Sequence, residues 1–386
     1  MKQVKPDVES FARIRVVGSG GSGKNAVNHM VNSKVKGVEF IAVNTDAQDL
    51  HHSFAKKKIH IGKNLTHGLG AGGNPEIGKR AAEETKEEIL EALKGSDMIF
   101  IAGGMGGGTG TGANPVIARA AKECGALTVA VVTKPFSFEG QQRMRLAEQG
   151  LDELRKEVDA LVVIPNDRLL AVVDRDTTVR NAFAMSDDIL RQAVEGISEL
   201  ITSPGLINVD FADIRAVMEN AGSALMGIGS ASGEKRAEEA AQQAINSPLL
   251  ELSISGAKGV LFAISGGDDL GMLEVQDAAK VITESIDPNA KVIFGAFRDE
   301  KVKRNELKVT VIATGFPDQA VQKGGSLFQL GRDDESKQKL QNTISQTVTS
   351  QQTQKKEEEQ KKEETKGNDD DDWGSVPAFL RRSKIK

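Results

Sequence analysis

The residues best suited to chemistry lie in a glycine-dense run at residues 103–112, Gly-Gly-Met-Gly-Gly-Gly-Thr-Gly-Thr-Gly. The apolar residues 98–102 before it predict a buried strand, and residues 113–121 after it predict the opening of a helix. Each glycine costs folding entropy, so seven glycines in ten residues need a reason. A bare backbone ahead of a helix N-terminus gathers N–H donors at the positive end of the helix dipole. The run therefore predicts an anion site of phosphate size.

A second glycine-rich loop, residues 18–25, reads Gly-Ser-Gly-Gly-Ser-Gly-Lys-Asn and follows a predicted strand. It matches the dinucleotide pattern G-x-G-x-x-G, and Asp46 then lies where an acid would bind a ribose. It is also one residue short of a Walker A loop, with Asn25 in place of the Ser or Thr that holds magnesium. Both interpretations stay open on this loop, and neither needs the run at residues 103–112.

Alternating strand and helix patterns position the two loops. Asn74 and Pro75 predict a helix start, with apolar positions continuing to Leu93. The apolar, β-branched runs are typical of parallel strands covered on both faces, which predicts a doubly wound α/β domain. These runs are residues 13–17, 38–43, 98–102, 126–132 and 160–164.

A long amphipathic helix is predicted over residues 176–202, and we expect it to connect the first domain to a smaller α/β domain. Gly and Pro residues mark the ends of the later elements. In this second domain the sequence predicts helices at residues 235–246 and 273–286 and strands at residues 259–264, 291–297 and 307–313.

Composition excludes several classes of protein. The chain has 386 residues, 39% hydrophobic and 27% charged, as expected of a soluble globular protein. Its net charge of −5 gives no field that favours nucleic acid, and no apolar run approaches the ~20 residues of a membrane span. The N-terminus has no apolar signal region, and the single cysteine excludes internal disulfides. We expect a cytoplasmic protein with neither a nucleic-acid partner nor a membrane span.

The C-terminal part differs in composition. Residues 349–372 contain no apolar residue, which predicts a disordered linker. Apolar residues then return at Trp373, Val376, Phe379 and Leu380, followed by basic ones, and this cluster predicts a short peptide that docks on a partner. The expected divisions are a flexible N-terminus (1–12), a nucleotide-binding domain (13–175), a connecting helix (176–203), a second domain (204–316), a linker (317–372) and a terminal peptide (373–386).

Taken together, the two glycine loops resemble those of the FtsZ family, the bacterial tubulin-like cell-division GTPases. Residues 104–112 resemble the tubulin signature, and residues 204–214, Pro-Gly-Leu-Ile-Asn-Val-Asp-Phe-Ala-Asp-Ile, are the next most specific match. The resemblance covers residues 11–316 and the terminal peptide at residues 376–381. Further matches are residues 21–28, 44–46, 68–75, 133–136 and 164–167 with Glu139 and Arg143.

The resemblance implies a GTP site and assigns its residues. Backbone N–H groups of the two loops would hold the phosphates, Glu139 and Arg143 would contact ribose and phosphate, and Phe183 would stack on guanine. Asn166 and Asp187 would read the edge of the base. The phosphate and loop residues implied are Gly21, Ser22, Gly23, Lys24, Asn25, Gly72, Gly104, Gly107, Gly108, Thr109 and Gly110.

The family also implies that catalysis takes place between subunits. Asn208, Asp210 and Asp213 would enter the nucleotide site of the next subunit, where the two aspartates position the attacking water. A head-to-tail contact that does not close generates a filament, so hydrolysis would be coupled to polymerisation. Without this resemblance, we would interpret Asp213 as the N-cap of a helix that begins at Ile214.

Lys24 departs from the family, which usually has Asn or Gly there. We expect its ammonium group to meet phosphate as a point charge, so that Lys24→Asn changes GTP affinity or turnover. Three alternatives remain. They are an NAD-dependent oxidoreductase, favoured by the first loop and Asp46; a monomeric P-loop-like NTPase, favoured by Lys24; and a scaffold that hardly hydrolyses GTP, which Asp210 and Asp213 disfavour.

The resemblance further implies partners and cofactors. GTP or GDP would be bound with Mg²⁺ held mainly by phosphates and water, since the five histidines show no metal-ligand spacing. The chain would form a homopolymer beneath the membrane at the division site. Its terminal peptide would bind a membrane-tethering adaptor and division regulators.

Overall fold

The computed structural model describes residues 12–316 except 171–176, 204, 251–252 and 300. Its strands form one sheet in the order β3-β2-β1-β4-β5-β6-β8-β11-β9-β10-β7. The first six in this order are all parallel. They are β1 (Ile14–Ser19), β2 (Val38–Asn44), β3 (Lys57–His60), β4 (Met98–Gly104), β5 (Leu127–Lys134) and β6 (Ala160–Pro165).

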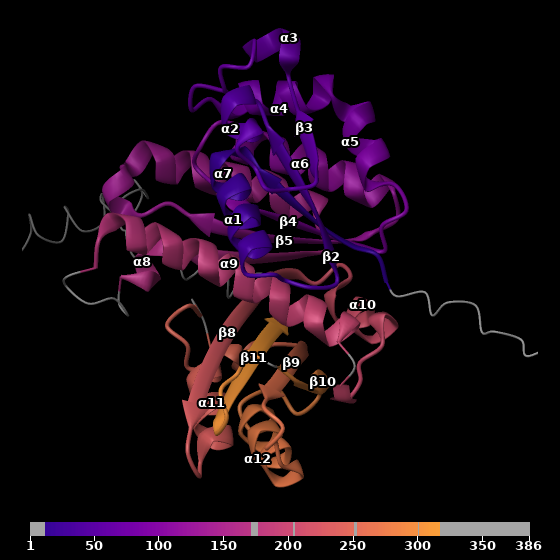
Figure 1. Ribbon diagram of the computed structural model, residues 1–386, viewed down its shortest axis with the longest axis vertical. Coiled ribbons are helices and arrows are strands. Elements are labelled where there is room, and N and C mark those ends of the chain that lie inside the picture. Colours follow the sequence, from indigo (N-terminus) through magenta and orange to yellow (C-terminus); the bar gives the residue numbers. More distant parts are fainter. Residues whose placement is uncertain (1–11, 171–176, 204, 251–252, 300, 317–386) are drawn as a thin grey trace, which may run out of the picture. The chain divides into compact units, whose positions relative to one another are not determined.

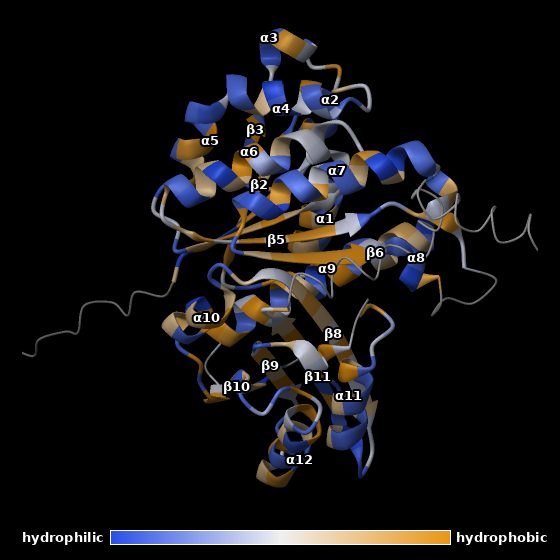
Figure 2. Ribbon diagram, turned by 180° about the vertical axis from the view of Figure 1, so that it is seen from behind, coloured by the Kyte–Doolittle hydropathy of each residue, from blue (hydrophilic) through white to orange (hydrophobic). Residues whose placement is uncertain are grey.

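Helices cover both faces of this parallel part, which confirms the doubly wound α/β fold. On one face α1 (Gly20–Asn32) and α9 (Val179–Thr202) pack through Met30, Leu190 and Ile197. On the other face lie α4 (Pro75–Glu84), α5 (Lys86–Leu93), α6 (Thr109–Glu123) and α7 (Gln141–Glu157). Figure 2 shows the strands β5 and β6 as apolar, as strands buried between two helical layers should be. The short helices are α2 (Ala47–His51), α3 (Lys63–Thr66) and α8 (Asn166–Leu169).

The remaining strands continue the same sheet. They are β7 (Gly205–Ile207), β8 (Gly222–Ser232), β9 (Gly259–Gly266), β10 (Lys291–Arg298) and β11 (Glu306–Thr314). β8 joins β6 in parallel over only Ala160–Val162, and β11 lies antiparallel between β8 and β9. The helices are α10 (Phe211–Met218), α11 (Arg236–Ile245) and α12 (Met272–Thr283), and the last two pack on the face away from α9.

Helix α9 contacts both parts of the sheet (Figure 1), and α10 also contacts β5, β9 and β10. Helix α9 lies against β4 and β5 from the first part and against β9 and β10 from the second. Thr178 caps its N-terminus by accepting from the Asn181 N–H, and Ser203 follows its last turn. Because α9 packs against strands of both parts, it helps to hold them together, as does the pairing of β6 with β8. None of the helices in the described ranges is both long and apolar enough to cross a membrane.

The structure corrects the prediction of a single helix after Asn74. The helix predicted from Asn74 to Leu93 is two helices, because Thr85 ends α4 and begins α5. The Thr85 hydroxyl donates to the Ala81 carbonyl and accepts from the Gly62 N–H. Asn74 caps α4 as predicted. The predictions for the N-terminal residues 1–11, the linker and the terminal peptide concern residues outside those described.

A buried polar cluster lies on α9 beside the turn that follows β10. Glu195 is 2% exposed and forms ion pairs with Arg191 and Lys301. Glu199 lies one helical turn further on. Burial and the charges of Glu195 and Asp299 raise its pKa to about 7, against the opposing charges of Lys308 and Lys301.

We expect Glu199→Gln to stabilise the protein at alkaline pH. Folding raises the pKa of Glu199, so the folded state holds the protonated carboxyl more strongly than the unfolded state does. The resulting contribution to the free energy of unfolding is complete below pH 4.5 and is lost as pH rises through about 7. The variant should therefore unfold with a free energy about 3 kcal/mol higher at pH 8, and the difference should shrink towards pH 5. Urea titrations at both pH values measure this.

Glu195→Gln is the opposite control. It removes a buried partner of Arg191 and Lys301, so it should destabilise at pH 8. If Glu199→Gln also lowered the free energy of unfolding at pH 8, the conclusion that folding raises the pKa of Glu199 would be wrong.

Candidate functional site

The first glycine loop joins β1 to α1 and packs tightly. A Cβ on Gly18 would lie 2.3 Å from the Gly23 carbonyl oxygen, and one on Gly23 would lie 2.6 Å from that of Ala102. These two glycines let α1 approach β1 and β4 closely. Gly20 has φ +69°, a conformation that L side chains rarely adopt, and its position turns the chain into α1.

The second loop joins β4 to α6, and the helix begins earlier than predicted. Residues 113–121 were expected to open the helix, but α6 starts at Thr109, inside the glycine run. Gly106 has φ +95°, and its N–H donates to the Thr111 hydroxyl at 2.8 Å. A Cβ on Gly20 would lie 3.0 Å from the Gly110 nitrogen, so the two loops meet. The N-termini of two helices therefore converge, which makes a strong anion site.

A cavity of about 360 Å³ opens where the loops meet, a volume within the range of small-ligand sites. Thirteen of the sixteen predicted nucleotide-binding residues line it. They are Gly21, Ser22, Asn25, Gly104, Gly107, Gly108, Thr109, Gly110, Glu139, Arg143, Asn166, Phe183 and Asp187. Gly23, Lys24 and Gly72 do not line it. The sequence analysis missed six lining residues, which are Ser19, Gly20, Met105, Thr133, Pro135 and Ser186.

One end of the cavity combines an aromatic ring with buried polar groups. Phe183 on α9 is 41% exposed and contacts the Phe136 ring edge to face, with centroids 5.3 Å apart. Asn166 is buried and accepts from the Ser186 hydroxyl at 2.9 Å. Burial raises the pKa of Asp187 to about 6, against the opposing charges of His29 and Lys24. A planar base could stack on Phe183 while Asp187 accepts from its edge.

Between this end and the glycine loops lie Glu139 and Arg143. They form an ion pair at 2.5 Å, and the other Glu139 oxygen accepts from the Phe136 N–H at 3.0 Å. Arg143 is half exposed and has donors left for a ligand. In the described part of the chain no group of three or more His, Cys, Asp or Glu side chains is placed to hold a metal ion.

The structure places the Lys24 side chain away from the cavity, contrary to expectation. Its ammonium group forms an ion pair with Asp49 at 2.6 Å, and Lys24 is 8% exposed. Asp49 also accepts from the Asn44 side chain at 2.8 Å. The lysine therefore ties α1 to α2 instead of meeting phosphate. This contact also removes the feature that favoured a monomeric P-loop-like NTPase.

Two aspartates have other local roles than expected. Asp46 caps α2 by accepting from the Asp49 N–H at 2.9 Å. This capping role accounts for an acidic residue at this position without a contact to ribose. The N-cap of α10 is Asp210, which accepts from the Ala212 N–H, and not Asp213. Asp213 lies in the first turn of that helix and is exposed.

The three catalytic candidates lie outside the cavity of their own chain. Asn208 accepts from the Gly205 N–H at 2.7 Å, and like Asp210 and Asp213 it is exposed. Asp187, in the cavity, lies fifteen residues before Thr202, the last residue of α9. At 1.5 Å per residue the helix carries the chain about 22 Å away before the candidate loop begins.

Comparison with known proteins assigns the family. Residues 13–174 match the model of the Tubulin/FtsZ family GTPase domain, and residues 222–317 match that of the FtsZ family C-terminal domain. A solved empty FtsZ dimer from M. jannaschii is 49% identical, with a TM-score of 0.77 over 80% of this chain and 89% of that chain.

Two structures from Haloferax volcanii share the fold at lower identity. CetZ2, a GTPγS-bound protofilament, is 21% identical with a TM-score of 0.67, over 81% of this chain and 96% of that one. CetZ1, a GDP-bound monomer, is 22% identical with a TM-score of 0.69, over 81% and 97%. Nothing in these comparisons supports the NAD-dependent oxidoreductase alternative. The chain therefore belongs to the FtsZ family of tubulin-like cell-division GTPases.

Proposed function

We propose that this GTPase completes its active site only between two subunits in a head-to-tail filament. The proposal rests on one observation: α9 separates the cavity from Asn208, Asp210 and Asp213. A rigid helix of this length keeps the exposed carboxylates from their own cavity. They are free to enter the cavity of a second copy, and the M. jannaschii relative was solved as a dimer.

In the proposed site the two glycine loops bind the phosphates through backbone N–H groups at the N-termini of α1 and α6. Asp210 and Asp213 of the adjoining copy orient the water, whose oxygen bonds to the γ-phosphorus as the bond to the bridging oxygen breaks. GDP and inorganic phosphate result, and the water's proton passes to a carboxylate or to solvent. Glu139 and Arg143 position the ribose and phosphates, and Phe183 stacks on guanine.

Magnesium fits this site as an ion held by phosphate. Of the described residues that line the cavity, Arg143 is the only cation, and it is already paired with Glu139. The charge of a triphosphate therefore needs a further counter-ion, which phosphate oxygens and water would hold. Mg²⁺ would supply neutralisation of the charge that develops on the leaving group.

Exposed apolar side chains support the head-to-tail contact. Leu69 is 85% exposed and pairs by its backbone with Asp46, and Phe138, 61% exposed, adjoins Glu139. Leu206 is 71% exposed and lies two residues before Asn208. An exposed apolar side chain, Phe138, thus adjoins a residue that lines the cavity, and another, Leu206, lies near the catalytic candidates. A contact between two different surfaces propagates into a filament.

We also propose that the filament lies in the cytoplasm beneath the membrane at the division site. The terminal peptide, residues 373–386, would bind a membrane-tethering adaptor and division regulators. Its tryptophan, apolar residues and basic end support this role, and the residues lie outside those described.

The test is GTP hydrolysis per subunit as a function of protein concentration, in the presence of magnesium. A threshold followed by a steep rise is expected, because a shared site forms only on assembly. A rate per subunit that stays constant down to the lowest concentration would mean a self-contained site, and the roles of Asp210 and Asp213 would be abandoned.

We expect GTP affinity to fall in mildly acidic solution. Asp187 must be ionised to accept from guanine, and its pKa is about 6 before nucleotide binds. Below pH 6 the affinity should fall by up to about tenfold per pH unit, because binding must first remove a proton. Fluorescent GTP titrations from pH 5 to 8 measure this. Asp187→Asn should bind weakly with no such dependence, and a parallel pH profile in both proteins would contradict the role.

A further inference from the structure

The sheet has an open edge along the first part of β2. β1 pairs with β2 from Val38 onwards, whereas β3 pairs only with Ile41–Asn44. In the described part of the chain, Val38, Glu39 and Phe40 therefore have a strand on one side and none on the other. Unpaired backbone N–H and C=O groups at such an edge can pair with an added strand.

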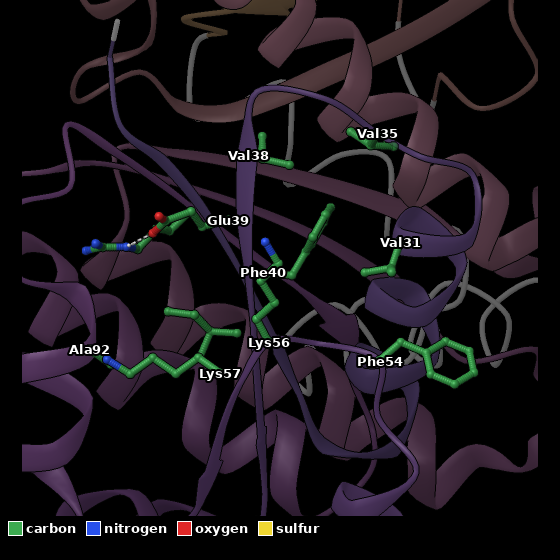
Figure 3. A pocket seen from close by; sticks show the side chains of 11 residues that line it. Val31, Val35, Val38, Glu39, Phe40, Phe54, Lys56, Lys57 and Ala92 are labelled. Carbon is green, nitrogen blue, oxygen red and sulfur yellow. Dashed lines mark hydrogen bonds and ion pairs between the residues drawn. The ribbon is translucent and has the colours of Figure 1, made fainter. Parts of the chain in front are cut away.

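A groove of about 680 Å³ follows this edge and is lined from both faces of β2. Figure 3 shows Val31, Val35 and Phe54 on one side of the β2 ribbon, and Glu39 and Ala92 on the other. Successive side chains of a strand point to opposite faces. A groove that receives side chains on both faces of an open edge has the shape that a β-strand would fill.

One side of the groove is apolar. Val31, Val38 and Phe40 are half-buried and pack against the main core cluster, so they form a firm floor. Phe54 is 57% exposed at the rim. Apolar side chains at alternate positions of a bound strand would cover Phe40 and Phe54.

The opposite side and the mouth carry positive charge. Arg15 is held by Glu39 at 2.8 Å and by the Ser96 hydroxyl at 2.8 Å, so its charge is balanced. Lys56 and Lys57 are exposed and have no ion pair or side-chain hydrogen bond within the described residues. The groove thus carries two unbalanced cations in a chain whose net charge is −5.

We propose that this groove docks an extended segment of a partner protein in which apolar and acidic residues alternate, bound as an added strand on β2. The apolar residues face Phe40 and Phe54, and the acidic ones face Lys57 on the opposite side, with Lys56 at the mouth of the groove (Figure 3). The groove and the nucleotide cavity have no lining residue in common, so the proposal is independent of the catalytic one. Three open residues provide few backbone bonds, and the affinity is correspondingly modest.

The experiment uses the full chain and a fluorescent, end-blocked heptapeptide of alternating glutamate and valine, followed by anisotropy. We expect a Kd on the order of 100 μM. Lys56→Glu with Lys57→Glu should weaken binding about tenfold or more, because two ion pairs become repulsions. The matched control, Lys235→Glu with Lys303→Glu, changes the net charge equally at exposed positions outside the groove and should bind as the unchanged protein.

Strand addition is tested separately by peptide N-methylation. Methyl groups on the amides that face β2 should abolish binding, and those on the alternate amides should leave it intact. Equal effects of the two peptides would overturn the proposal, as would equal losses in the two lysine variants or no binding at all. Binding only after removal of residues 1–10 would also overturn it. The groove would then belong to the chain's own Asp7-Val8-Glu9, which has the same alternation.

Discussion

Asp210→Asn is expected to lower GTP turnover by about 10²–10⁴-fold, the usual contribution of a positioned acid or base, while the Kd for GTP stays unchanged. The carboxylate is exposed and lies beyond the far end of α9 from the cavity of its own chain. It therefore cannot contribute to nucleotide binding in a monomer. Fluorescent-GTP binding below the assembly threshold, and phosphate release above it, measure the two quantities separately.

The choice of asparagine separates catalysis from folding. Asp210 caps α10, and asparagine caps a helix as well as aspartate does. Asp210→Ala removes both the carboxylate and the cap, so it should lose turnover and about 1 kcal/mol of stability. Thr178→Ala removes the cap of α9, which lies outside the catalytic loop. It therefore measures the loss of stability caused by removing a cap alone. Normal turnover in Asp210→Asn would show that this aspartate has no catalytic role.

Mixing two inactive variants tests whether the site is shared. Asp210→Asn keeps an intact cavity, and a variant blocked in the cavity keeps an intact Asp210. If assembly pairs subunits at random, about a quarter of the contacts in an equal mixture join the two intact halves, so about a quarter of the normal turnover should return. No recovery in the mixture would contradict a site completed between subunits.

The buried strands were predictable because each is a short, apolar, β-branched run. β8 was not recognised, since it contains Gly227 and Gly229, and glycine weakens a strand. In the structure a Cβ on either residue would lie within about 2 Å of a carbonyl oxygen of α11, at Ala244 or Ala240. These glycines permit the close approach of α11, the helix that follows β8 in the chain, and the strand's own residues do not reveal that requirement.

The two glycine loops and the family resemblance together predicted most residues that line the nucleotide cavity, and they missed several neighbours of those residues. Thr133 lies near the end of β5, Pro135 follows that strand, and Ser186 lies within α9. Residues 133–136 match the family, but the match assigned no nucleotide contact to them. Lys24, in contrast, was predicted to bind nucleotide but does not line the cavity. Its place in a glycine loop indicated phosphate, but the loop pattern carries no information about Asp49, which folding brings to 2.6 Å.

Gly107→Val is expected to abolish nucleotide binding without unfolding the protein. A Cβ at Gly107 would have no heavy atom within 4 Å, so the added side chain meets open space in the cavity that Gly107 lines. Valine there would exclude the phosphates from neighbouring N–H groups. Losing two hydrogen bonds to a charged group weakens binding by about 100-fold or more. Stability should stay within about 0.5 kcal/mol of the unchanged protein.

Gly112→Val, in the same glycine run, should have a different effect. Its Cβ would lie 1.9 Å from the Pro75 carbonyl oxygen, because this glycine lets α6 pack against α4, and Gly112 does not line the cavity. We expect a loss of about 3 kcal/mol or more, with GTP affinity kept in the fraction that stays folded. Thermal unfolding and GTP titration of the two variants thus divide the glycine run into residues that bind phosphate and residues that pack helices. If both variants lost stability equally, the phosphate role of Gly107 would have no support.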